Sequence, residues 1–363
     1  MAARAEKAQN EKRNMSTKTL ADVMEALIGA AYINGGVSKA VACMSTLLPD
    51  HEWIGVERCR EILYDIAPSN YLLPATLLPL EQLTGYSFHK KSLLVEAMTH
   101  ASYMGASFGS FERLEFIGDA ILDYIIVTKL FEVSPPLPQS RLHRLKTAVV
   151  NGDFQAFLVM ETCAQQEATE ITKDVQVKRT EFKQPLWAFM MHSSTAIGVE
   201  QGLGKARHAE LRGDIADALE HSENYPWALL SRLRARKFYS DLFESILGAV
   251  WIDSGSMEAC EAVIERFGLL GYLRRLLRDD VEVTHPKESV GQLAVDRTVQ
   301  YVIDTRLDGE ELAFTCQVLV GGELKAEVVD GVDKEEVKTR AAEVAVRVMK
   351  EEAKGLDAMD LTP

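Results

Sequence analysis

The chain has 363 residues, 47% of them hydrophobic, which is enough for two domains and part of a third, each with its own core. Its 54 acidic residues outnumber its 40 basic residues, so the formal net charge of −14 argues against a uniformly basic, nucleic-acid-coating protein. The sequence shows no signal peptide and no apolar run that predicts a membrane span, and its five scattered cysteines lack metal or disulfide spacing. We therefore expect an intracellular protein, cytoplasmic or nuclear.

Residues 18–36 (KTLADVMEALIGAAYINGG) form the first periodic segment and carry an acidic pair, Asp22 and Glu25. The two acids are three positions apart, so on a helix they share one face. A single pair of this kind is usually a solvated helix face.

Residues 111–119 (FERLEFIGD) place three acids on one helical face inside an apolar segment. Glu115 and Asp119 are four apart, and Glu112 precedes Asp119 by seven, so the three lie in one narrow stripe. Like charges in such a stripe repel each other, and a bound cation would relieve this repulsion. The alternative is again a solvated charged face.

The segment 163–225 separates this stripe from the next acidic motif. It is apolar around Trp187 and polar and charged over 202–217. Two interpretations stay open, a loop that contacts substrate and a disordered spacer.

A second acidic pair, Asp241 and Glu244, lies one helical turn apart in another apolar segment. Two helices that cross at Glu115 and Asp241 would gather four carboxylates. Four oxygen ligands without His or Cys suit Mg²⁺, and such a site favours phosphodiester hydrolysis by metal-activated water. Clusters of cations flank both motifs, and a phosphate substrate needs such cations: Arg141, His143, Arg144 and Lys146, and Arg232, Arg234, Arg236 and Lys237. Ordinary solvated charge runs are the alternative for either cluster alone.

The last 80 residues are predicted to form a separate α-β-β-β-α module. We expect helices over 286–297 and from about 333 to 350, with strands at 301–306, 314–320 and 324–329. Gly321-Gly322 is a hairpin turn signal, and Asp333 with Glu336 has capping-box spacing. Residues 285–363 hold 10 Lys and Arg against 17 Asp and Glu, which argues against tight nucleic-acid binding.

These motifs resemble the ribonuclease III family. Residues 112–119 are similar to its signature, Asp241-x-x-Glu244 to its second acidic motif, and 80–88, 96–103 and 142–151 to its other helices. The resemblance implies that Glu115, Asp119, Asp241 and Glu244 are catalytic metal ligands, all four with the acid type unchanged. It further implies that Glu112 and Lys237 lie beside the substrate, although a surface lysine is an equally good interpretation of Lys237.

Residues 18–36 align without gaps on 237–255, an offset of 219 residues that indicates a duplicated domain. The first copy has no signature before it in this chain, so Asp22 and Glu25 lack acidic partners here. Two such domains before a small C-terminal domain resemble the C-terminal part of fungal Dicer-like proteins. We expect a remnant of a first ribonuclease III domain at 1–65, a complete one at 78–275 and a double-stranded RNA-binding-like domain at 283–355.

The last domain resembles double-stranded RNA-binding domains, in which the final helix presents lysines to phosphates. Lys334 and Lys338 match that pattern, whereas Glu335 stands at a position that is usually basic. A small domain that binds protein instead is the alternative.

The resemblance implies a mainly α fold and Mg²⁺-dependent cleavage of double-stranded RNA, with Mn²⁺ able to substitute. The products would be short interfering RNA for RNA silencing, plausibly in antiviral defence. Since these domains cut both strands only as pairs, a homodimer or a missing upstream portion would complete the enzyme. The rival interpretations are a catalytically incomplete fragment and a non-catalytic RNA-binding scaffold on the same fold.

Overall fold

A computed structural model describes residues 16–105, 109–171, 177–308 and 311–360. The chain divides into two compact units, Met1–Ala67 and Pro68–Pro363. Each unit is described separately below.

The first unit contains α2 (Thr17–Leu47) and α3 (Val56–Ile66). Helix α2 is interrupted at Gly35 and Gly36, and Gly36 has a φ of 70°. The aligned glycine of the second copy, Gly255, ends its helix with a φ of 66°. Both φ values are positive and favour glycine, but ψ is −166° at Gly36 and 14° at Gly255, so the aligned glycines adopt different turns.

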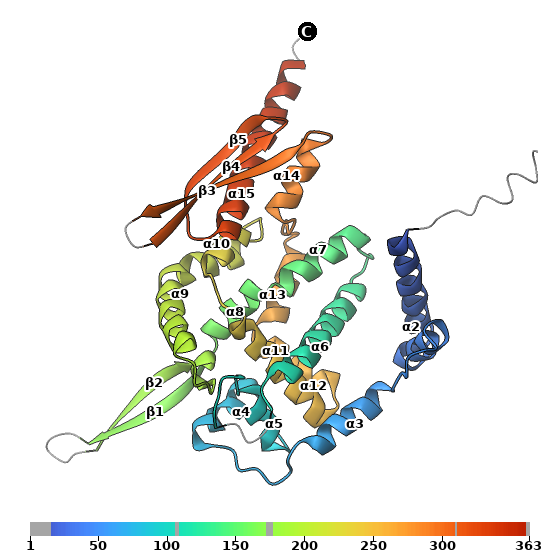
Figure 1. The fold of residues 1–363 in the computed structure, drawn as a ribbon, viewed down its shortest axis with the longest axis vertical. Helices are drawn as coiled ribbons and strands as arrows, with labels where there is room; N and C mark the ends of the chain where they lie inside the picture. Colours follow the sequence, from blue (N-terminus) through green and yellow to red (C-terminus); the bar gives the residue numbers. More distant parts are fainter. Residues whose placement is uncertain (1–15, 106–108, 172–176, 309–310, 361–363) are drawn as a thin grey trace, which may run out of the picture. The chain divides into compact units, whose positions relative to one another are not determined.

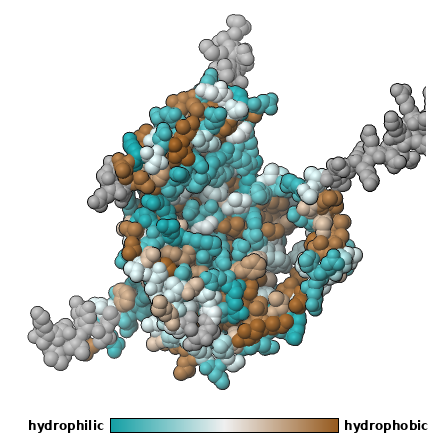
Figure 2. All heavy atoms as spheres, in the orientation of Figure 1, coloured by the Kyte–Doolittle hydropathy of each residue, from teal (hydrophilic) through white to brown (hydrophobic). Residues whose placement is uncertain are grey.

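Helix α2 exposes an apolar surface within its own unit (Figure 2). Its large exposed apolar side chains are Leu20, Val23, Leu27, Ile33 and Val37. Among the described helices, α2 is long and apolar enough to cross a membrane by length and composition alone. The same sequence pattern forms the buried helix α11 in the second unit. We therefore interpret the apolar surface of α2 as the packing face of a core helix rather than as a membrane span.

The second unit is mainly helical up to Arg278, as predicted (Figure 1). Its helices before and around the two acidic motifs are η1 (Ala75–Leu77), α4 (Leu78–Thr84), α5 (Lys91–Ala97), α6 (Glu112–Phe131), α7 (Gln139–Val149), α8 (Gly152–Glu161), α10 (Trp227–Arg232), α11 (Phe238–Ser254), α12 (Met257–Arg266) and α13 (Leu269–Arg278). Helix α11 is the centre of this body, because every residue from Phe238 to Asp253 is buried. It packs most extensively on α6, and also on α5, α8 and α12.

The segment between the acidic motifs is structured in its described part. It forms an antiparallel hairpin of β1 (Cys163–Ile171) and β2 (Val177–Pro185), then η2 (Leu186–Phe189) and the long helix α9 (Thr195–His221). Figure 1 shows the hairpin projecting from the helical body. The spacer interpretation is therefore wrong for the described residues of this segment.

The C-terminal module comprises α14 (Pro286–Ala294), β3 (Val299–Asp308), β4 (Glu311–Val320), β5 (Glu323–Gly331) and α15 (Lys334–Asp360). The three strands form one antiparallel sheet in the order β3-β4-β5, which confirms the predicted α-β-β-β-α order. Gly321 and Gly322 have φ values of 62° and 86° and join β4 to β5, as the hairpin signal predicts. The core lies between the sheet and the helices, around Val290, Val318 and Ala341.

Two details of the module differ from the sequence prediction. Helix α14 ends at Ala294 rather than Arg297, because Val295 has a φ of 54° and cannot continue a right-handed helix. The Asp333 carboxylate accepts from the backbone N–H of Glu336 at 2.9 Å, as in a capping box. The Glu336 carboxylate returns to the N–H of Val332 at 3.0 Å, one residue before the expected partner.

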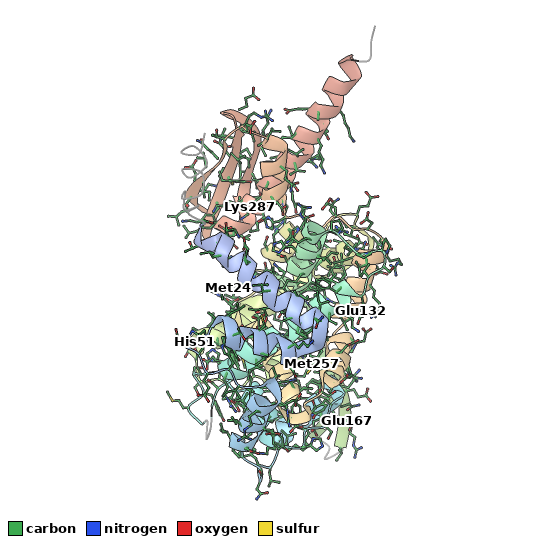
Figure 3. All side chains as sticks on the ribbon, turned by 90° about the vertical axis from the view of Figure 1, so that its right-hand side faces the viewer. Met24, His51, Glu132, Glu167, Met257 and Lys287 are labelled. Carbon is green, nitrogen blue, oxygen red and sulfur yellow. The ribbon has the colours of Figure 1, made fainter. Side chains whose placement is uncertain are left out.

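Polar contacts join the module to the helical body. Arg144 on α7 pairs with Glu288 on α14 at 2.7 Å, and Glu343 on α15 accepts from the backbone N–H of Ala228 on α10 at 3.2 Å. Lys287, labelled in Figure 3, lies at the start of α14 and pairs with Glu335 of α15 at 2.6 Å. Residues 68–363 accordingly form one compact unit.

Candidate metal centre

Three carboxylates from two helices meet where α6 packs on α11. Glu115 of α6 and Asp241 and Glu244 of α11 each offer one oxygen, and these oxygens lie within 4.8 Å of one another. Asp241 and Glu244 are each 8% exposed, while Glu115 is half-buried. Oxygen-only donors at this spacing fit a hard divalent cation such as Mg²⁺ or Mn²⁺.

Asp119, the fourth predicted ligand, lies outside this three-oxygen group and is exposed. It still acts on the cluster, because its charge contributes to the raised pKa of Glu244. Its own pKa is raised by partial burial and by Asp123, with Lys146 opposing. The structure thus brings together three of the four predicted ligands, with the fourth at the rim.

Burial and mutual repulsion make it unfavourable for all carboxylates of the cluster to be ionised without a cation. Burial, followed by the charge of Asp119, raises the pKa of Glu244 to about 8. Burial also raises the pKa of Asp241, although Lys237 opposes this shift. Because carboxylates in such surroundings are stabilised by a cation, the donor set fits a resident metal ion.

Lys237 supplies a positive charge to the cluster. Its Nζ donates to Glu115 at 2.7 Å and to Asp241 at 2.5 Å. Burial alone would lower the pKa of Lys237, but the hydrogen bonds to Asp241 and Glu115 outweigh it and raise the pKa well above its usual range. Lys237, which the resemblance placed beside the substrate, therefore bridges the two acidic motifs while its side chain stays exposed.

Gln155 on α8 belongs to the site, and sequence reasoning missed it. It is 1% exposed, its amide donates to the backbone carbonyl of Val150 at 3.1 Å, and a hydrogen bond from its side chain lowers the pKa of Glu244. The only sequence signal is an amide inside an otherwise apolar helix over 152–161. Such a signal is too common to identify a site by itself.

Glu112 opens α6 and is exposed, and its charge contributes to the raised pKa of Asp241. It accepts a hydrogen bond from the Ser110 hydroxyl and is not one of the three gathered ligands. Its neighbour Arg113 turns inward and binds the buried Glu96 through two nitrogens. This ion pair ties the start of α6 to α5.

Comparison with protein families identifies the two parts of the second unit. Residues 112–255 match the ribonuclease III domain, and residues 279–361 match the double-stranded RNA-binding domain of Dicer-like protein 2. The chain therefore contains a ribonuclease III domain and a Dicer-like double-stranded RNA-binding domain.

The chain is similar to curated proteins named Dicer-like protein 2. The chain is 45% identical to that of Pyricularia oryzae over 95% of its own length, and 42% identical to that of Cryphonectria parasitica over 96%. It spans about a quarter of the length of these relatives, 25% and 26% respectively. Among solved structures, the nuclease domain of ribonuclease III from Campylobacter jejuni is 23% identical, with a TM-score of 0.34 over 53% of this chain and 96% of that one.

In the double-stranded RNA-binding domain, the two predicted substrate lysines differ in their surroundings. Lys334 is exposed and has no ion-pair partner among the residues that the structure describes. Lys338 donates to Glu335 at 2.8 Å, and Glu335 also binds Lys287. Lys287 and Lys338 lower the pKa of Glu335 to about 2, so Glu335 stays ionised and neutralises these two lysines.

The first-copy acids, Asp22 and Glu25, are exposed on α2. Asp22 lies 3.6 Å from Lys18, the same i,i+4 pairing that Lys237 and Asp241 make in the ribonuclease III domain. Within the described part of the first unit, no further carboxylate joins them.

Proposed function

We propose that this chain is the catalytic C-terminal part of a Dicer-like endoribonuclease and cleaves double-stranded RNA. The observation that carries the proposal is the meeting of Glu115, Asp241 and Glu244 within 4.8 Å inside a ribonuclease III domain. A double-stranded RNA-binding domain follows in the same compact unit, which supports the same substrate.

Glu115, Asp241 and Glu244 would hold one or two Mg²⁺ ions, with Asp119 as the further ligand and Mn²⁺ as a substitute. When bound, such ions activate water and stabilise charge on the phosphate. Lys237 holds the facing carboxylates together and donates hydrogen bonds at the cluster. The buried Gln155 would orient Glu244 through its side-chain hydrogen bond, and the exposed Glu112 would lie beside the substrate.

Helix α6 also offers a surface for pairing with another ribonuclease III domain. Phe116, Val127 and Phe131 are exposed by 79%, 37% and 67% and recur at helical spacing along one stripe. Beside it, a cavity of about 240 Å³ between α6 and α7 is lined by Leu130, Leu142 and neighbouring side chains. Exposed aromatic side chains next to an apolar cavity favour a protein partner, either a second copy or an upstream domain of a longer polypeptide.

The name of the relatives supports a place in RNA silencing, where the products would be short interfering RNA. A role in antiviral defence, and a cytoplasmic or nuclear location, belong to the same proposal. The proposal also includes the domain boundaries, namely 1–65 for the first-domain remnant, 78–275 for the ribonuclease III domain and 283–355 for the RNA-binding domain.

Cleavage of end-labelled double-stranded RNA tests the proposal, with Mg²⁺ or EDTA and with Glu115→Ala as the control. We expect Mg²⁺-dependent products that the substitution abolishes. Fragments on native and denaturing gels would indicate a paired enzyme that cuts both strands, and fragments on denaturing gels alone a single nicking site. Retained RNA binding without any cleavage would support the scaffold alternative and contradict the proposal.

A further inference from the structure

The long insert between the two acidic motifs holds a loop of the catalytic domain in place. Arg207 on α9 donates through Nε to the carbonyl of Leu233 at 2.9 Å and through Nη2 to that of Arg234 at 3.3 Å. Its guanidinium also binds Glu200, about two turns away on the same helix. The side chains of Arg207 and Glu200 are 21% and 15% exposed, so this anchor is largely shielded from water.

The anchored loop leads directly into the metal centre. It joins α10 to α11, and Lys237, which binds Glu115 and Asp241, follows Arg236 in the chain. Arg234 and Arg236 are both exposed. Arg236 has a weak ion pair with Glu200 at 3.7 Å. The loop thus places two exposed guanidinium groups within three residues of Lys237, whose amino group binds the carboxylates.

The backbone at Arg234 supports a functional use of its side chain. Its φ of 48° lies in the left-handed region, which glycine adopts at no steric cost and which other residues rarely adopt. The N–H of Arg234 bonds to the carbonyl of Ser231 at 3.1 Å, and its own carbonyl is held by Arg207. An arginine kept in a conformation suited to glycine indicates that the guanidinium itself is required.

Basic and acidic side chains line one cavity beside the same loop. A cavity of about 360 Å³ is lined by Arg234 and Arg236 and by the carboxylates of Glu200 and of Asp333, Glu335 and Glu336 at the start of α15. Carboxylates therefore lie near the loop arginines, where Glu200 pairs with Arg236, whereas Glu335 pairs with Lys287 and Lys338. A phosphate backbone would compete with these carboxylates, so we expect the loop to act on affinity rather than on the chemical step.

We propose that Arg207 is a positioning residue, through which the insert fixes Arg234 and Arg236 to bind phosphates of the RNA strand next to the metal centre. This inference rests on the proposed function, because it names the part of the chain that holds the same substrate. It gives the insert a role in substrate binding, as one of the two interpretations of the sequence predicts.

Steady-state cleavage of a short double-stranded RNA by the full chain tests the inference, with KM and kcat measured over a range of salt concentrations. Arg234→Gly removes the guanidinium and relieves the backbone, so we expect KM to rise about tenfold with kcat within twofold. The slope of log KM against log salt should fall by about one, the effect of a lost phosphate contact. The thermal unfolding midpoint should not fall.

Arg207→Ala should raise KM by a similar factor, and the double variant Arg207→Ala/Arg234→Gly should be no worse than the poorer single variant. Arg212→Ala is the matched control, because Arg212 lies on the same helix and binds Glu161 through two nitrogens without touching the loop. Its KM should not change.

The outcomes separate the two proposals. An active chain in which Arg234→Gly leaves KM and the salt slope unchanged overturns the inference alone. So does an equal effect of Arg212→Ala and Arg207→Ala. A folded, unaltered chain that neither binds nor cleaves the RNA overturns the proposed function and this inference together.

Discussion

Gly118 on α6 lies directly against the backbone of Glu244 on α11. A Cβ atom placed on Gly118 would stand 1.7 Å from the carbonyl oxygen of Glu244, and one on Gly248 would stand 2.1 Å from that of Leu114. The two acidic motifs thus meet at a pair of glycines, each of which lets the opposite helix approach. This backbone contact brings Glu115 within reach of Asp241 and Glu244.

Gly118→Ala should separate the helices and dismantle the cluster. Because the new methyl group meets backbone that cannot move aside, we expect the free energy of unfolding to fall by about 3 kcal/mol or more, with loss of cleavage. Urea denaturation measures the first effect. Gly202→Ala is the control, since Gly202 lies on α9 with no neighbour within 4 Å, and there the helix should gain about 0.5–1 kcal/mol.

The raised pKa of Glu244 predicts how the stability of the metal-free protein depends on pH. Its value of about 8 in the folded state lies above the usual value of 4.5, so the folded protein binds the proton more tightly than the unfolded chain does. This contribution is fully present below about pH 4.5 and is lost as pH rises to about 8. Thermal unfolding in EDTA should show a melting temperature that falls across this window.

The variant Glu244→Gln keeps the shape without the titration, so its melting temperature in EDTA should exceed that of the native chain at pH 8. Mg²⁺ should stabilise the native chain at pH 8 and leave the variant nearly unchanged. Equal pH profiles for the two proteins would show that Glu244 is not the titrating group.

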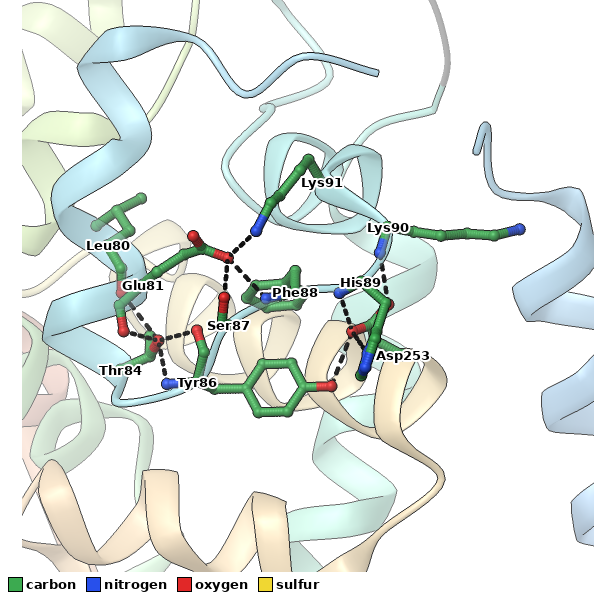
Figure 4. Close-up of polar contacts among 10 residues, drawn as sticks. All are labelled: Leu80, Glu81, Thr84, Tyr86, Ser87, Phe88, His89, Lys90, Lys91 and Asp253. Atoms are coloured by element: carbon green, nitrogen blue, oxygen red, sulfur yellow. Dashed lines mark hydrogen bonds and ion pairs between the residues drawn. The ribbon is translucent and has the colours of Figure 1, made fainter. Parts of the chain in front are cut away.

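Asp253 should be a stabilising residue without a role in catalysis. Its carboxylate has no exposed surface and accepts from the Tyr86 hydroxyl at 2.8 Å and from the backbone N–H groups of His89 and Lys90 at 2.7 and 2.9 Å (Figure 4). These bonds tie the segment before α5 to the end of α11. Asp253→Ala should lower the free energy of unfolding by about 3 kcal/mol.

Single-turnover cleavage per folded Asp253→Ala molecule should be unchanged at low temperature, since Asp253 lies more than two helical turns from Glu244. The exposed Asp296 provides the control, and Asp296→Asn should leave the melting temperature unchanged. A large loss of cleavage in folded Asp253→Ala would place this residue in the catalytic machinery instead.

We expect Glu335 to lower the affinity of the C-terminal domain for double-stranded RNA. It neutralises Lys287 and Lys338 at 2.6 and 2.8 Å, and its pKa of about 2 keeps it ionised. Glu335→Gln should raise the affinity for double-stranded RNA about fivefold at low salt and steepen the salt dependence. Fluorescence anisotropy of labelled RNA measures both quantities.

Glu265→Gln controls for the change in net charge, because Glu265 binds Arg274 in an exposed ion pair elsewhere in the helical body. Its RNA affinity should stay close to that of the native chain. An equal gain in both variants would mean that overall charge, rather than release of the two lysines, governs binding.

Local patterns in the sequence predicted much of this architecture. The i,i+4 stripe of Glu115 and Asp119 and the pair Asp241 and Glu244 are visible because acids stand out in apolar helices. Gly321-Gly322 and the capping residue Asp333 act within a few positions of themselves, and the structure has a turn and a helix start where each predicted one. The exceptional end of α14 at Val295 has no comparable signal, because valine rarely adopts a positive φ.

Contacts between segments that are distant in the chain could not be predicted from the sequence. Arg207 reaches the carbonyls of Leu233 and Arg234 only because α9 folds back beside α10, and an arginine in a polar helix carries no sign of that. Gln155 meets Glu244 across the packing of α8 on α11 for the same reason. Asp119 illustrates the converse, since its helical spacing is correct while its carboxylate stays at the rim of the cluster.

Direct metal binding tests the central claim that the crossing of α6 and α11 builds a divalent-cation site. Calorimetric titration of Mn²⁺ into the RNA-free chain should show one or two bound ions, with affinity weakened at least tenfold in Asp241→Asn. Folded native protein that binds no Mn²⁺, or binding that Asp241→Asn leaves unchanged, would contradict the claim.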